Sequence, residues 1–296
     1  MSDEVLCNLC GSGDYKVLFP AGVAQVNRIV VCKACTLMYA NPRSQDVDVV
    51  AIEKYDADSV FEHVTKTNPQ RLEKEALQTR DYADTRRMLA QRFPQRGELL
   101  EIGSGFGYLL NYFRADGWKV RGVEPNVGLC RYARGEFGLD VTATSLDKAA
   151  FPDHSFDAVL MMHVIEHVPD PMAVFREVFR ILRPGGMFVL ETPRYDSLMF
   201  RMLGRRERSL SCNGHIYFFT SATLAAMAKL AGFGIEKASY VGRSLTLDRL
   251  LYNVGVISKS KALQASLSKM ARKLSLNRIS MRLNARDMER VYLRKA

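Results

Sequence analysis

The sequence predicts an α/β protein with a doubly wound, mostly parallel sheet, and two observations carry that prediction. From Glu98 to Gly242, short apolar runs of strand character alternate with segments whose apolar residues recur at helical spacing. Such alternation is typical of a parallel sheet covered by helices on both faces. A glycine-rich turn from Gly103 to Gly107 follows the first run, at the end of a strand where open α/β sheets bind ligands.

The individual elements follow from the same pattern. We expect strands near 98–102, 118–124, 140–143, 156–162, 186–191 and 233–242, and helices near 107–116, 126–137, 171–182 and 221–231. The third of these helices has a clear start, because Asp170 can cap it and Pro171 suits the first helical position. Ahead of the alternation, apolar spacing predicts a helix over 70–93 that ends at Pro94.

Composition and charge limit the class of protein. With 296 residues, 47% of them apolar, the chain can bury one α/β core and a small accessory module. The acidic start lacks a signal-peptide pattern, and no run of about 18 apolar residues occurs, so we expect a cytoplasmic protein. Residues 241–296 hold 13 Lys or Arg and three acids, against 29 of each sign in residues 1–240. The excess charge therefore lies at one end and favours a polyanion or an anionic surface.

Two acids flank the glycine turn. Glu101 precedes it, and Glu124 ends the next strand about 20 residues on, where doubly wound folds place a carboxylate that binds ribose hydroxyls. The dinucleotide fingerprint does not fit, because the third glycine is Gly107 rather than the next residue. Glu101 would repel a pyrophosphate but suits an ammonium or sulfonium group. Alone, the turn could be purely structural; with both acids it indicates a nucleotide-type ligand.

These residues resemble a known family. Residues 98–242 look like the class I methyltransferases that use S-adenosylmethionine. The acid and glycines of the loop are similar to their first motif, and Glu124 is similar to their ribose-binding acid. Segments 155–159, 163–171 and 182–186 resemble their fourth strand, the loop after it and the turn before the fifth strand.

The resemblance implies a Rossmann-like sheet of seven strands, the last of them antiparallel. It also implies that Ser145 and Leu146 lie near the adenine and His163 near the methionine end of the cofactor. The full set of cofactor contacts that we expect is Glu101, Gly103, Gly105, Gly107, Glu124, Pro125, Ser145, Leu146 and His163.

The same region spells a competing motif. His163-x-x-Glu166-His167 matches an inverted zinc-protease signature, which requires both histidines on one continuous helix. Pro169 and Pro171 follow within a few residues and prevent a helix of that length. We therefore do not expect a catalytic zinc there.

A second cluster lies near the N-terminus. Two Cys-x-x-Cys pairs are separated by 21 residues, which is typical of two knuckles that close a tetrahedral zinc site. The expected ligands are Cys7, Cys10, Cys32 and Cys35. Because all four ligands are thiolates, the zinc would be structural; the alternatives are redox pairs or unligated thiols. Cys130 and Cys212 lie outside the pattern and are expected to be ordinary thiols.

Residues 31–43 add a second resemblance, to the zinc-binding N-terminus of bacterial methyltransferases linked with sugars and surface glycans. Those that methylate carbon usually carry a further C-terminal domain, which this chain is expected to be too short to hold. The resemblance thus implies O-methylation of a small-molecule, sugar or glycan hydroxyl. Two alternatives stay open: a nucleotide-sugar C-methyltransferase, and a ribosomal RNA base methyltransferase with a zinc knuckle, which the basic charge would favour.

A hydroxyl acceptor also needs a base, and histidine is the usual choice near neutral pH. His215 follows the fifth expected strand and precedes a helix, so its loop can reach the pocket mouth. The alternative is that His215 only holds that loop. His167 is the second candidate, with Glu166 as an orienting partner. The remaining histidines are His63, His154, which we expect in a surface turn, and His163.

The alternation lapses after Gly242. Residues 244–276 predict two amphipathic helices, broken at Ser258–Ser260 and inserted before a final strand near 287–294. Their apolar stripes are Leu247, Leu250, Val254 and Ile257, then Leu263, Leu267, Met270 and Leu274; the basic residues are Lys259, Lys261, Lys269, Arg272 and Lys273. These helices either pack on their own domain or contact an anionic membrane or a second subunit.

The chain is thus expected to have four sections. They are a zinc ribbon over 1–42, a connecting segment with a helix over 43–95, a cofactor-binding core over 96–243, and inserted helices with a final strand over 244–296.

Overall fold

The computed structural model describes residues 3–22, 28–43, 69–207, 210, 214–258, 260–274, 276 and 279–296. His63, Cys212, Lys259 and most of the expected connecting segment lie outside these ranges. The side chains of residues 69–71, 253, 255–257, 261 and 272 lie outside the description as well.

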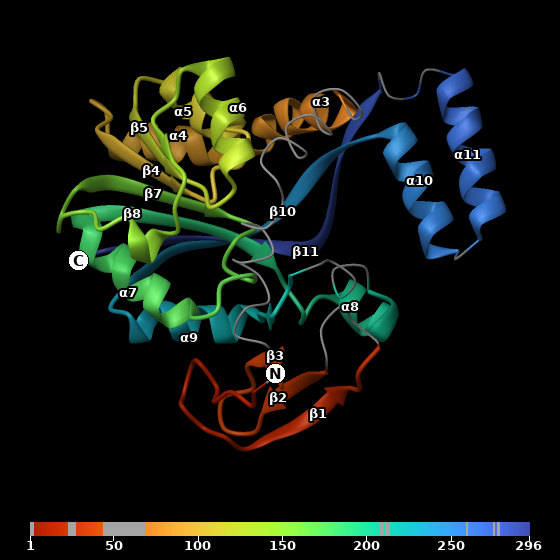
Figure 1. Cartoon of the computed structure of the whole chain (residues 1–296), viewed down its shortest axis with the longest axis horizontal. Coiled ribbons are helices and arrows are strands. Elements are labelled where there is room, and N and C mark those ends of the chain that lie inside the picture. The colour runs from red at the N-terminus through yellow and green to blue at the C-terminus, as the bar shows by residue number, and fades with distance from the viewer. Residues whose placement is uncertain are drawn as a thin grey trace.

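A seven-stranded sheet forms the centre of the described chain, with the order β10-β11-β8-β7-β4-β5-β6 (Figure 1). Its strands are β4 (Glu98–Ile102), β5 (Lys119–Val123), β6 (Val141–Thr142), β7 (Phe156–Met162), β8 (Leu182–Pro193), β10 (Gly234–Thr246) and β11 (Ser280–Arg294). Strands β6, β5, β4, β7 and β8 pair in parallel, whereas β11 is antiparallel to both β8 and β10. The predicted doubly wound sheet with an antiparallel last strand is confirmed.

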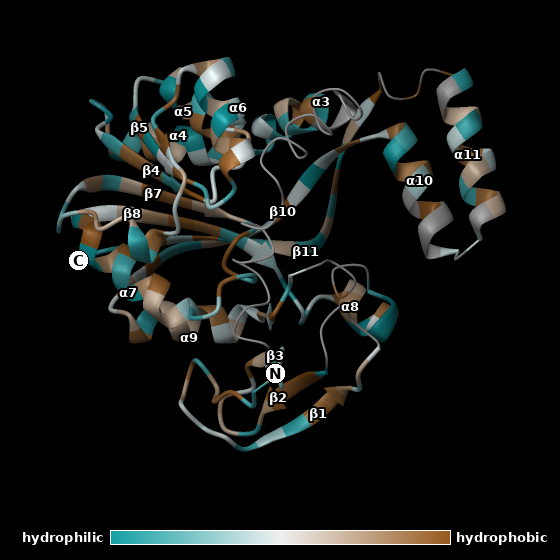
Figure 2. Cartoon of the chain, in the orientation of Figure 1, coloured by the Kyte–Doolittle hydropathy of each residue, from teal (hydrophilic) through white to brown (hydrophobic). Residues whose placement is uncertain are grey.

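Helices cover both faces of this sheet. On one face lie α4 (Ala83–Arg92), α5 (Tyr108–Arg114) and α6 (Val127–Phe137), and on the other α7 (Pro171–Ile181) and α9 (Ser221–Leu230) (Figure 1). Successive residues Val159 and Leu160 of β7 point to opposite faces and are both fully buried, which explains why the strand is apolar throughout. Figure 2 shows the apolar colour concentrated in the central strands. Asp170 caps α7 as expected, since its Oδ1 accepts a hydrogen bond from the Ala173 backbone N–H at 2.8 Å.

The helix predicted over 70–93 is two helices, α3 (Pro69–Gln78) and α4, separated by a 3-10 turn at Thr79–Tyr82. The break has a tertiary cause. The buried carboxylate of Asp81 accepts hydrogen bonds from the backbone N–H and the hydroxyl of Ser244 in β10, at 2.7 and 2.6 Å.

A second sheet joins the N-terminal segment to the central domain. It contains β1 (Tyr15–Phe19), β2 (Ile29–Cys32), β3 (Met38–Ala40) and β9 (Tyr217–Phe218), in that order. Strand β9 comes from the loop between β8 and α9 and pairs antiparallel with β3. Tyr39 and Tyr217 meet there, fully buried. The sequence did not predict β3 or β9, which are too short for a periodic signal.

The C-terminal section is a long ribbon that ends in a helical hairpin. Helices α10 (Leu247–Ile257) and α11 (Lys261–Lys273) stand where two helices were predicted, and they project from the body of the protein (Figure 1). The two strands that lead to these helices are longer than predicted, because β10 and β11 continue to pair as far as Thr246 and Ser280. A short helix, α8 (Leu198–Leu203), was not predicted. Among the described helices, none is long and apolar enough to span a bilayer.

Candidate functional site

The glycine turn connects β4 to α5 in a conformation that favours glycine. Gly103, Gly105 and Gly107 have φ angles of +71°, +52° and +81°. A Cβ atom on Gly103 would lie 2.4 Å from Val164, and one on Gly107 would lie 2.7 Å from Leu139. At Gly105, by contrast, no atom lies within 4 Å of the same position. Packing thus requires two of the glycines, while the third leaves the backbone open to a ligand.

Glu124, at the end of β5, locks this turn. Its Oε2 accepts a hydrogen bond from the Gly105 N–H at 3.0 Å, and its Oε1 accepts one from the Asn126 N–H at 2.9 Å. Burial raises the pKa of its carboxyl group. Each carboxylate oxygen keeps a second lone pair, which can accept a hydrogen bond from a hydroxyl group. Cys130 donates to the Glu124 carbonyl at 3.1 Å and is buried, as expected of an ordinary thiol.

Glu101 is a buried acid without a cationic partner among the residues that the structure describes. It is only 4% exposed, and its Oε2 has no hydrogen-bond partner among the described residues. Burial, together with the negative charge of Glu124, raises its pKa well above the ordinary value. A buried carboxylate oxygen without a hydrogen-bond partner is unfavourable unless a ligand supplies one. The ammonium group of an amino acid moiety has the chemistry to do so.

The other expected contacts lie at the same edge of the sheet. Pro125 follows Glu124, and Ser145 and Leu146 follow β6 and begin a 3-10 turn at Leu146–Lys148. His163 follows β7. Because parallel strands end at one edge, these residues lie on the side of the sheet that carries the glycine turn.

A contact with a buried carboxylate, which the sequence did not reveal, anchors His163. Its Nε2 lies 3.1 Å from Glu191 Oε1 in β8, and its backbone N–H donates to the Glu191 carbonyl at 2.8 Å. Glu191 Oε2 is 2.6 Å from Arg290 Nη2 in β11. Burial opposes the ionisation of Glu191, but Arg290 and His163 outweigh it and lower its pKa to about 2. The sequence offered one sign of this contact, because Glu191 is an acid that directly follows the apolar run of β8.

Glu166, His167 and His215 form a compact cluster beside this edge. The two imidazole rings meet edge to face with centroids 4.6 Å apart, and His215 Nε2 lies 4.0 Å from Glu166 Oε1. The Thr192 hydroxyl donates to Glu166 Oε2 at 3.0 Å, and the Tyr195 hydroxyl lies 3.3 Å from His215 Nδ1. The sequence named the three members but did not predict that all of them meet.

The two histidines differ in exposure. His215 is 7% exposed, and burial lowers its pKa to about 4, although Glu166 acts in the opposite direction. His167 is half-buried. An acceptor can therefore reach His167, whereas His215 is enclosed and a weak proton acceptor at neutral pH.

No helix holds the segment from His163 to His167, which agrees with the rejection of the protease signature. One carboxylate and two imidazoles within 4.8 Å of one another could also bind a divalent cation. His154 lies exposed in a turn, as expected.

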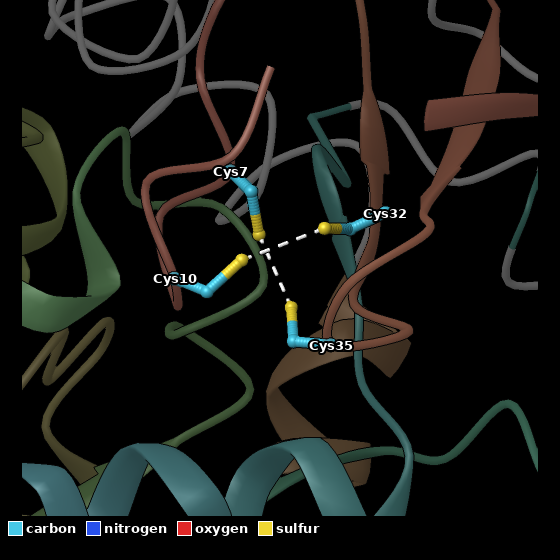
Figure 3. Close-up of side chains that lie close together, drawn as sticks. All are labelled: Cys7, Cys10, Cys32 and Cys35. Carbon is cyan, nitrogen blue, oxygen red and sulfur yellow. Dashed lines mark hydrogen bonds between the residues drawn. The ribbon is translucent and has the colours of Figure 1, made fainter. Parts of the chain in front are cut away.

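The four N-terminal cysteines converge on one point (Figure 3). The sulfurs of Cys7 and Cys35 are 3.3 Å apart, those of Cys10 and Cys32 are 3.5 Å apart, and all four lie within 4.8 Å of one another. A tetrahedral Zn–S₄ site with bonds of about 2.3 Å has sulfurs about 3.8 Å apart. Burial opposes the ionisation of Cys32, but the Cys35 and Ala34 N–H groups outweigh it and lower its pKa to about 7. The cluster has the donor set and size of a structural zinc site.

The cysteine cluster is also tied to the central domain. Asn8, between the first two cysteines, donates to Asp170 at 2.8 Å and accepts from the Met172 N–H at 2.8 Å. The Ala40 N–H donates to the Ile216 carbonyl at 2.8 Å, next to His215. Order in the cysteine module therefore supports the loop that carries His215.

Comparisons with known proteins agree with this geometry. A family model described as a methyltransferase domain matches residues 74–238, and the chain belongs to the class I S-adenosylmethionine-dependent methyltransferases. A ubiquinone biosynthesis O-methyltransferase of Xanthomonas euvesicatoria pv. vesicatoria is 32% identical over 197 residues, which cover 62% of this chain and 77% of that protein. One from Aromatoleum aromaticum is 29% identical over 231 residues, which cover 74% and 92%.

Among solved structures, the chain is similar in fold to an S-adenosylmethionine-dependent methyltransferase from Thermotoga maritima. The TM-score is 0.51 at 18% identity, and the match covers 80% of this chain and 99% of that one.

Proposed function

We propose that this methyltransferase transfers the methyl group to an oxygen atom of a hydroxyl-bearing small molecule. The observation that carries the proposal is the half-buried His167, beside Glu166 and His215, at the sheet edge that also holds Glu101 and Glu124. Both relatives described above are named O-methyltransferases, which supports oxygen as the acceptor atom.

The residues at the glycine turn fit the cofactor. Glu101 would pair with the ammonium group of the cofactor, and Glu124 would accept hydrogen bonds from its ribose hydroxyls. Ser145 and Leu146 would border the adenine, and the anchored His163 would border the methionine end. When bound, S-adenosylmethionine supplies a methyl group activated by a positively charged sulfur.

His167 is the residue that we assign to the acceptor proton. Methyl transfer is an in-line displacement, so the chain must orient the hydroxyl oxygen and accept its proton. His215 is enclosed, and its pKa of about 4 makes it the weaker base. It would instead hold the His167 ring, beside the Glu166 carboxylate that Thr192 fixes.

Two classes of hydroxyl-bearing acceptor fit the proposal. A sugar or glycan hydroxyl remains a prediction from the N-terminal resemblance, and the names of the relatives offer the hydroxyl of a ubiquinone precursor as another acceptor. Both classes need the same base and the same in-line geometry.

The four cysteines would hold one structural zinc ion. Their sulfur spacing and their contacts with α7 and β9 support this part of the proposal.

The test is methyl transfer from cofactor labelled with ¹³C at the methyl group, with sugars, catechols and quinol precursors as acceptors. We expect a product heavier by one labelled methyl group, with an NMR shift typical of a methoxy carbon. Labelling at carbon or nitrogen, or only of RNA, would overturn the assignment to oxygen.

A further inference from the structure

Exposed apolar side chains gather on the C-terminal hairpin, defined here as residues 247–283. Of the 16 large apolar side chains that are exposed among the described residues, seven lie in this segment. They are Val254, Leu263, Met270, Leu274, Ile279, Met281 and Leu283. Apolar residues scattered singly on a surface need no explanation, but a concentration on one projecting element marks an interaction site.

These side chains are arranged in rows. Leu263, Met270 and Leu274 are spaced by seven and four residues, so they form one stripe along α11. Met281 and Leu283 alternate along β11, so they share one face of the ribbon that carries the helices. The hairpin stands clear of the central sheet, at the end of β10 and β11 (Figure 1). The body of the described chain therefore leaves this stripe exposed.

The same hairpin is strongly basic. Residues 247–283 contain eight Lys or Arg and one acid, Asp248. Lys269 and Lys273 are exposed on α11, beside the apolar stripe, and neither has an ion-pair partner within the described residues. An apolar stripe with lysines along its border is the pattern of a helix that lies in the interface of a membrane.

The combination of charge and apolar surface selects among partners. A second copy of the chain would bring the same positive charge to the interface and be repelled. A nucleic acid would satisfy the lysines but leave the aliphatic side chains in water. An anionic bilayer satisfies both, because its headgroups attract the lysines and its acyl region takes the apolar stripe.

We propose that the hairpin docks the protein reversibly on anionic lipid bilayers, with α11 in the interface. This inference is independent of the proposed acceptor, since it uses no residue of the cofactor or base site.

Vesicle flotation tests it. The full-length protein should float with vesicles of phosphatidylcholine and phosphatidylglycerol in a 7:3 ratio, float much less with phosphatidylcholine alone, and be released by high salt. The double variant Lys269→Glu/Met270→Ser should partition at least about tenfold more weakly, because each basic residue near an anionic surface contributes about fivefold, the glutamate adds repulsion, and the apolar Met270 side chain is lost.

A matched control lies on α9, which stands apart from the hairpin in Figure 1; there Lys229 and Leu230 are an exposed basic and apolar pair. Lys229→Glu/Leu230→Ser should bind vesicles like the unchanged protein. Thermal unfolding verifies that both double variants are folded, which is expected because all four positions are exposed. Equal, negligible flotation with both kinds of vesicle would overturn the proposal, as would equal weakening by the two double variants.

Discussion

The buried pair of Glu191 and Arg290 should dominate the response of the protein to acid. Glu191 is 2% exposed and Arg290 is 1% exposed, and the guanidinium also donates to the Thr85 hydroxyl at 2.9 Å. Glu191→Gln leaves the Arg290 charge uncompensated in the interior. Breaking a buried pair in this way costs about 3–5 kcal/mol of the free energy of unfolding.

The pKa of Glu191 gives a second estimate of how much the pair contributes to the free energy of unfolding. It falls from an ordinary value of 4.5 to about 2. At about 1.4 kcal/mol per pH unit, this corresponds to roughly 3 kcal/mol in favour of the folded state at pH 7. Because the folded-state pKa is the lower one, this stabilisation is complete above pH 4.5 and is lost as pH falls toward 2. About 2 kcal/mol should remain at pH 3.5.

The assay is urea unfolding of the unchanged protein and Glu191→Gln at several pH values between 7 and 3.5. The difference in the free energy of unfolding should be largest at neutral pH and shrink in acid. Asp14→Asn is the control, because Asp14 and Lys33 form an exposed ion pair, which should contribute less than about 1 kcal/mol. A loss below about 1 kcal/mol for Glu191→Gln, or a difference that does not change with pH, would refute this account of the pair.

Three further predictions concern the site. Glu124→Ala should weaken binding of S-adenosylhomocysteine about 10- to 100-fold in titration calorimetry, because a buried charged acceptor is lost; unchanged affinity would remove this residue from the cofactor site. Cys32→Ser should lose one zinc ion per chain by elemental analysis and reduce turnover through the β3–β9 contact, with cofactor affinity retained; metal retention would contradict the zinc site. His167→Ala should lower kcat about 10²-fold or more with cofactor affinity unchanged. A larger loss in His215→Ala would transfer the role of base to that residue.

Local patterns in the sequence were sufficient for most of the secondary structure of the core and for locating the residues that we expect to contact the cofactor. The alternation after Glu98 predicted the sheet because a buried strand is apolar throughout and a covering helix is apolar on one side. The glycine turn and Glu124 could be found because their functions depend on short, fixed spacings. The two Cys-x-x-Cys pairs were recognisable for the same reason.

Only the tertiary structure decided which distant groups meet. Arg290 and Glu191 are 99 residues apart, and nothing near either one indicates the other, because burial selects the partner. The pairing of β3 with β9 links the cysteine module to the loop of His215, and strands this short show no periodicity. Likewise, Asp81 interrupts a helix because its carboxylate binds Ser244, 163 residues away. The exposures of His167 and His215 also depend on the residues that enclose them, so the sequence named both candidates and only the packing distinguished their exposure.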